Sequence, residues 1–124
     1  MIDSITFDAK HAATLARFWC EVLPEYEIAP YTDEDIASLK SKGIDDPEDD
    51  PSVMCISKAS DIRLFFQTVP EGRTAKSRTH LDVRVKDRAH FERLKQLGAT
   101  VVMEWDGGYW MNDPDGNDFC AMLS

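Results

Sequence analysis

Apolar and polar residues alternate at the start of the chain and then change to a helical spacing. Residues 4–8 alternate strictly, which predicts a half-buried strand. Residues 12–23 carry their large apolar side chains on one helical face, and Pro24 marks the end of this predicted helix. A short strand is predicted at residues 26–29. The chain therefore opens with a strand, a helix and a second strand.

The middle of the chain predicts a second helix and two further strands. Thr32 and Asp35 have the spacing of a capping box, so a helix is predicted to start here and to end near Gly43. Acidic residues and prolines in residues 45–51 indicate a loop. Two strands are predicted after this loop, at residues 52–58 and 63–69.

The opening pattern returns after a polar link at residues 70–78. Residues 79–85 alternate strictly and predict a strand, and residues 88–97 have a helical spacing that ends at Gly98. Turn-forming residues then separate three predicted strands. These strands span residues 100–105, 109–112 and 119–123.

The order of strand, helix and three strands thus occurs twice. The two starts, Ser4 and His80, lie 76 residues apart. We expect an α+β fold in which two βαβββ modules form a curved, barrel-like mixed sheet with a central cleft. Residues 1–124 are predicted to form a single domain, with a first module at about 1–72 and a second at about 78–124.

Charge and composition narrow the classes of partner. The net charge of −9 opposes binding to nucleic acid, because phosphates require a basic surface. No apolar run approaches the roughly 20 residues of a membrane helix, and the amino terminus lacks the pattern of a secretory signal. The three cysteines lie far apart and are expected to be reduced thiols. We therefore expect a cytoplasmic protein that binds neither nucleic acid nor membrane.

Several segments of the chain resemble a known family. They are residues 65–71, 78–83 and 112–120, the last of which contains the turn Asp-Pro-Asp-Gly-Asn. Together with residues 16–19 on the first predicted helix, they are similar to the glyoxalase-like domains of the glyoxalase, bleomycin-resistance and dioxygenase superfamily, also called the vicinal oxygen chelate superfamily. The resemblance implies paired βαβββ modules, a homodimer and a small-molecule ligand on the concave sheet.

The resemblance also implies positions for metal ligands, because enzymes of this family hold a divalent metal with side chains from four strands. Ser4 stands at the first position, where serine is a poor ligand, and His80 matches the family's histidine. Cys120 replaces a usual glutamate, and Gln67 offers only an amide. We therefore expect no metal cofactor. The alternative is a divalent ion such as zinc, nickel, manganese or iron on His80, Gln67 and Cys120.

The predicted ligand contacts are these last three residues together with Phe65 and Trp110, because aromatic side chains can form an apolar wall. Asp8 and Asp82 alternate with apolar residues, and alternation leaves open whether they face the cleft as acid or base, or face solvent. No catalytic residue is assigned. The first hypothesis is metal-independent binding of a small organic molecule. The alternatives are a metal-dependent lyase, isomerase or dioxygenase, and a structural interaction domain without a pocket.

Overall fold

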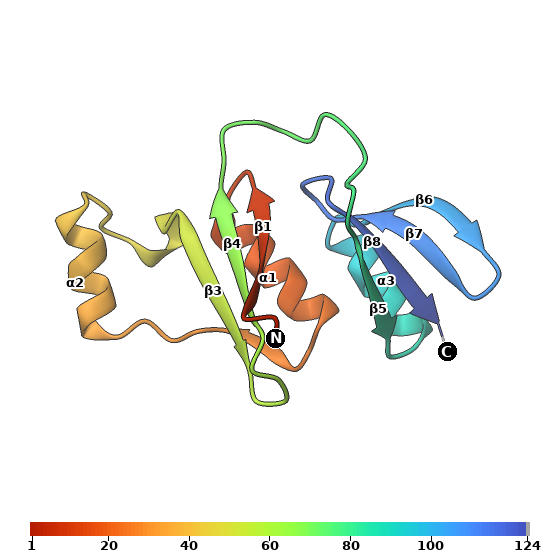
Figure 1. Ribbon diagram of the computed structural model, residues 1–124, viewed down its shortest axis with the longest axis horizontal. Coiled ribbons are helices and arrows are strands. Elements are labelled where there is room, and N and C mark those ends of the chain that lie inside the picture. The colour runs from red at the N-terminus through yellow and green to blue at the C-terminus, as the bar shows by residue number, and fades with distance from the viewer. Residues whose placement is uncertain (124) are drawn as a thin grey trace.

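A computed structural model describes residues 1–123, which form two four-stranded sheets with helices packed on one face of each (Figure 1). The first half of the chain contains β1 (Ser4–Ala9), α1 (Ala12–Val22), β2 (Tyr26–Ile28), α2 (Asp33–Ser41), the 3-10 helix η1 (Pro47–Asp49), β3 (Ser52–Ser57) and β4 (Arg63–Thr68). The second half contains β5 (Leu81–Val85), α3 (Arg88–Gln96), β6 (Thr100–Trp105), β7 (Gly108–Asn112) and β8 (Asp118–Leu123).

The two sheets have the same topology. Their strand orders are β1-β4-β3-β2 and β5-β8-β7-β6. In each sheet the first strand runs parallel to the last strand, and the other neighbours are antiparallel. Each half is therefore a βαβββ module, and the predicted α+β fold is confirmed. The two sheets stay separate and open rather than closing into one barrel.

The start of the second module differs slightly from the prediction. The strand predicted at 79–85 begins at Leu81, so His80 lies in the link just before it. The ladder between β5 and β8 begins at the pair Leu81–Phe119, because Asp118, one residue earlier on β8, bonds to the backbone N–H and the hydroxyl of Ser77 in the link. The side chain of His80 is consequently placed by the link as well as by the sheet.

Alternating burial defines two faces on each sheet. On β1, Phe7 and Ala9 are buried beneath α1, whereas Asp8 between them is exposed. On β5, Val83 is buried on the helix side and Asp82 is exposed. Successive residues of a strand point to opposite faces, so Asp8 and Asp82 lie on the face away from the helices. We call this side of each sheet its open face.

One apolar core runs through both modules. Trp19 on α1 is fully buried, and its ring centroid lies 4.7 Å from that of Phe7 and 5.2 Å from that of Phe119. Phe119 belongs to β8 of the second module and is also fully buried. Full burial of such a side chain stabilises a fold by about 1.5–3 kcal/mol. Helix α1 therefore supplies core contacts to both modules.

Hydrogen bonds from the turn before β8 connect the second module to the first. The indole N–H of Trp19 donates to Oδ2 of Asp113 at 2.9 Å. The amide of Asn117 donates to the backbone carbonyl of Asp8 at 3.1 Å. The turn predicted at residues 113–117 thus forms, and it bonds directly to the first module.

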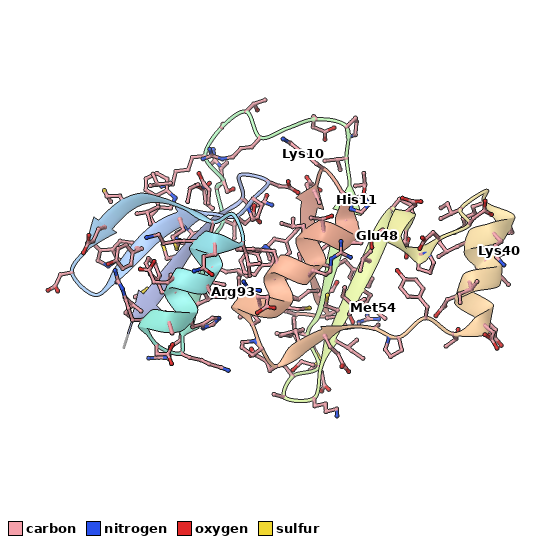
Figure 2. All side chains as sticks on the ribbon, turned by 180° about the vertical axis from the view of Figure 1, so that it is seen from behind. Lys10, His11, Lys40, Glu48, Met54 and Arg93 are labelled. Atoms are coloured by element: carbon pink, nitrogen blue, oxygen red, sulfur yellow. The ribbon has the colours of Figure 1, made fainter. Side chains whose placement is uncertain are left out.

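The helix α2 projects from the first module at the end away from the second module (Figure 1). Thr32 and Asp35 form the predicted capping box at its start. On the returning segment, the guanidinium of Arg17 donates to both carboxylate oxygens of Glu48, at 2.6 and 2.8 Å. Glu48 also lies beside His11 at the start of α1 (Figure 2). None of the described helices is long and apolar enough to cross a membrane.

Candidate functional site

The open face of the second sheet carries three of the predicted site residues. Strand β8 lies between β5 and β7, and its register places Cys120 opposite Asp82 on one side and opposite Trp110 on the other. His80 precedes β5 and contacts Asp82. The structure therefore brings His80, Cys120 and Trp110 together on one surface, with Asp82 among them.

His80, Asp82 and Cys120 form a compact polar cluster. Nε2 of His80 lies 3.2 Å from Oδ1 of Asp82. One imidazole nitrogen, one carboxylate oxygen and the Cys120 sulfur all lie within 4.8 Å of one another. His80 and Asp82 are 42% and 64% exposed, whereas Cys120 is buried. Asp82 can orient the imidazole, which leaves the other ring nitrogen free to meet a ligand.

The thiol of Cys120 is held in its protonated form. Burial raises the pKa of Cys120, and the negative charge of Asp82 and a thiol hydrogen bond to that carboxylate raise it further. Only a thiolate is an effective nucleophile, so Cys120 does not have the environment of a catalytic cysteine. Its role in a ligand site is limited to packing, or to metal binding if an ion displaces the proton.

Trp110 is fixed beneath the link that joins the modules. Its indole N–H donates to Oδ1 of Asp118 at 2.9 Å, and the ammonium of Lys76 lies 4.4 Å from its ring centroid. Cation–π contacts of this kind contribute about 0.5–1 kcal/mol where they are exposed. The ring of Trp110 is therefore partly covered by the link.

Asp118 holds that link against β8. Burial raises the pKa of Asp118, but hydrogen bonds from the backbone N–H of Ser77 and from Trp110 and Asn112 outweigh this effect, so the pKa lies well below its usual range. Arg73 adds two bonds at 3.2 Å to the same carboxylate, whose side chain is only 1% exposed. Asp118 thus stays ionised and positions both ends of residues 73–77.

The other two predicted site residues lie on the open face of the first sheet. The amide of Gln67 on β4 donates to Oδ1 of Asp8 at 2.9 Å. Phe65, two residues earlier, lies under the guanidinium of Arg63, 5.7 Å from its ring centroid. Phe65 and Met54 line a cavity of about 310 Å³ beside α2. Phe65 thus contributes to a wall in the first module, at a site separate from His80.

A smaller cavity lies where the two modules meet. Its volume is about 230 Å³, and it is lined by residues of β1, of the link, of the start of β5 and of the start of β8. Thr6 and Asp8 contribute from the first module, and His80 and Leu81 from the second. Gln67 reaches this cavity only indirectly, through its hydrogen bond to Asp8. We call this space the junction cavity.

The donor atoms of His80, Asp82 and Cys120 partly fit the divalent metal that the family resemblance implies. Ligands about 2.0–2.3 Å from a tetrahedral zinc ion are about 3.3–3.8 Å apart, so small side-chain shifts would suffice for His80, Asp82 and Cys120. A nitrogen, oxygen and sulfur set favours zinc over magnesium. All three donors belong to the second module, however, and the expected position on β1 holds Ser4. The four-strand arrangement of the family is therefore not reproduced.

The sequence alone assigned no role to two residues that organise this surface. It left open which way Asp82 faces, and the structure places its carboxylate between His80 and Cys120. No role was predicted for Asp118, which accepts five hydrogen bonds from four residues. The available signal was an aspartate at the start of an otherwise apolar strand.

Comparisons with known proteins agree with this architecture. A family model described as "Glyoxalase-like domain" matches residues 4–122. No curated protein matches the chain.

Three solved structures illustrate the shared fold. A fosfomycin resistance protein, FosX from Mesorhizobium loti, has 18% identity and a TM-score of 0.63 over 98% of this chain and 90% of its own. A glyoxalase/bleomycin resistance protein from Albidiferax ferrireducens T118 has 17% identity and a TM-score of 0.57, over 100% and 98%. A glyoxalase-related enzyme from Fulvimarina pelagi has 16% identity and a TM-score of 0.62, over 100% and 88%.

Proposed function

Because the chain belongs to the glyoxalase-like domain family of the vicinal oxygen chelate superfamily, we propose that it binds a small organic molecule in the junction cavity, without the family's four-strand metal site. The observation that carries this proposal is the cavity itself, which both modules line and which His80 borders. A ligand there would contact the two modules at once.

The lining of the junction cavity suggests the kind of ligand. Ile5 and Leu81 offer apolar surface, while Thr6 and His80 offer hydrogen-bonding groups. Its volume of about 230 Å³ lies below the roughly 300–1,000 Å³ of sites for drug-sized ligands, so the ligand is small. We infer a compact molecule with one apolar part and one oxygen-containing polar group that meets the imidazole of His80, which Asp82 orients.

Fragment binding followed by NMR tests this proposal directly. The chain is labelled with ¹⁵N and screened against small oxygen-containing fragments, with fosfomycin included because one protein of similar structure is a fosfomycin resistance protein. We expect shifted signals to cluster at residues 5–8 and 77–81, and we expect His80→Gln to weaken binding at least tenfold. His11→Asn is the matched control, since His11 caps α1 outside the junction cavity. Clustering of the hits at α2 instead would refute the proposed site.

A second candidate function is metal-dependent catalysis, which the spacing of His80, Asp82 and Cys120 favours. A zinc-type ion held there would polarise a carbonyl or lower the pKa of bound water. The sequence predicted Gln67 as the third metal ligand beside His80 and Cys120, whereas Asp82 takes that place in the structure. Substitutions at residues 67 and 82 therefore distinguish the two ligand sets. Cobalt(II) is added as a spectroscopic probe, and a sulfur-to-cobalt band is expected that Cys120→Ser and Asp82→Asn abolish and Gln67→Ala preserves. Absence of this band would reject the second candidate.

The homodimer and the cytoplasmic location stay predictions. The dimer is checked by sedimentation velocity of the purified chain over a range of concentrations.

A further inference from the structure

Two cysteines of the first module lie in contact beneath its sheet. Sγ of Cys20 on α1 is 3.6 Å from Sγ of Cys55 on β3, although the residues are 35 positions apart in the chain. The third cysteine, Cys120, lies on the open face of the other sheet. The fold alone creates this pair, because the sequence contains no Cys-x-x-Cys motif.

We propose that Cys20 and Cys55 are a modification site, at which a small-molecule disulfide or a peroxide forms a reversible intramolecular disulfide. The sulfurs, now 3.6 Å apart, must approach by about 1.5 Å to reach the bond length of about 2.05 Å. Rotation of the partly exposed Cys20 side chain on the surface helix provides such a movement more readily than repacking of the fully buried Cys55.

The environment assigns different roles to the two thiols. The hydrogen bond between them lowers the pKa of Cys20, and the same bond together with burial raises the pKa of Cys55. Cys20 is also the more exposed of the two. Cys20 is therefore the thiol that meets an external oxidant, and Cys55 is the thiol that resolves the product.

Either oxidant forms the disulfide between Cys20 and Cys55 in two steps. With a small-molecule disulfide, the Cys20 thiolate attacks one sulfur and releases the other as a thiolate, which leaves a mixed disulfide on Cys20. Cys55 then loses its proton and attacks the Cys20 sulfur, which releases the second small thiol. With a peroxide, Cys20 becomes a sulfenic acid, and Cys55 displaces its hydroxyl as water. In both cases two thiols are oxidised by two electrons and the oxidant is reduced.

The bond would link α1 to β3 on the helix-covered face of the first sheet. This face is opposite the open face, and neither cysteine borders the junction cavity. The proposal therefore does not depend on the proposed function. The expected physical consequence is a more stable first module, because closing a loop of about 35 residues restricts the unfolded chain.

Peptide mapping after oxidation tests the proposal on the unmodified chain. The reduced protein is incubated with oxidised glutathione, quenched in acid, and its remaining thiols are alkylated under denaturing conditions. We expect a mass lower by two hydrogens, one alkylated cysteine, and a tryptic peptide 18–40 joined to peptide 43–58. We also expect the melting temperature to rise by about 10 °C and to return on reduction.

Two variants test the role of each cysteine in the bridge. Cys120→Ala keeps the pair and should give the same linked peptides and the same shift. Cys55→Ala removes the resolving thiol, so Cys20 should accumulate as the mixed disulfide with glutathione. The proposal is wrong if the native chain stays reduced, if Cys120 takes part in the bridge, or if a mixed disulfide persists on Cys20 while Cys55 remains open to alkylation.

Discussion

Replacing Asp118 by asparagine removes the charge that holds the link between the modules. The carboxylate accepts bonds from the backbone N–H of Ser77 at 2.6 Å, from Trp110 at 2.9 Å and from Asn112 at 2.6 Å. An asparagine keeps one acceptor oxygen and turns an NH₂ group toward the remaining donors. Hydrogen bonds to a charged group contribute about 1.5–3 kcal/mol each, so the loss of two predicts a stability decrease of about 3–6 kcal/mol.

Urea unfolding at pH 7 measures this decrease directly. The matched control is Asp3→Asn, since Asp3 is 75% exposed and pairs with Arg63 at the surface, where such pairs contribute at most about 1 kcal/mol. A decrease for Asp118→Asn no larger than that of the control would refute the assignment of Asp118 as the group that holds the link.

The same variant has a characteristic pH dependence. The pKa of Asp118 is lower in the folded chain than in the unfolded chain, so its contribution is fully present above the ordinary aspartate value of about 3.9 and is lost as the pH falls toward the folded value. The stability difference between native chain and variant should therefore be about 1 kcal/mol smaller at pH 3 than at pH 7. A difference that is constant or larger at pH 3 would contradict this reasoning.

Two further predictions concern a glycine and a surface ion pair. Gly98→Ala should lower stability by about 1–2 kcal/mol in thermal unfolding, because Gly98 has a φ of +110° and the added Cβ would lie 3.2 Å from Pro114. The control is Gly72→Ala, whose added Cβ meets no atom within 4 Å and should have little effect. Equal effects of the two glycine variants would contradict the argument. Arg17 lowers the pKa of Glu48, so Arg17→Ala should return that pKa to the ordinary glutamate range in an NMR titration, and an unchanged value would exclude the ion pair.

The sequence determined the local elements because their signals are local. The alternation at residues 4–8, the capping box at Thr32 and the turn before β8 all depend on neighbouring residues, and each predicted element formed. The repeated order of elements then limited the fold to two like modules. The boundary before Leu81 was misplaced because it depends on where the pairing with the distant strand β8 begins.

The tertiary structure alone decided which residues meet. Alternation shows that Asp82 and Val83 face opposite ways, but only packing beneath α3 decides which one is buried. The register between β5 and β8 then sets Asp82 beside Cys120, and the packing of α1 on β3 sets Cys20 beside Cys55. These contacts join residues far apart in the chain, so no local pattern could contain them.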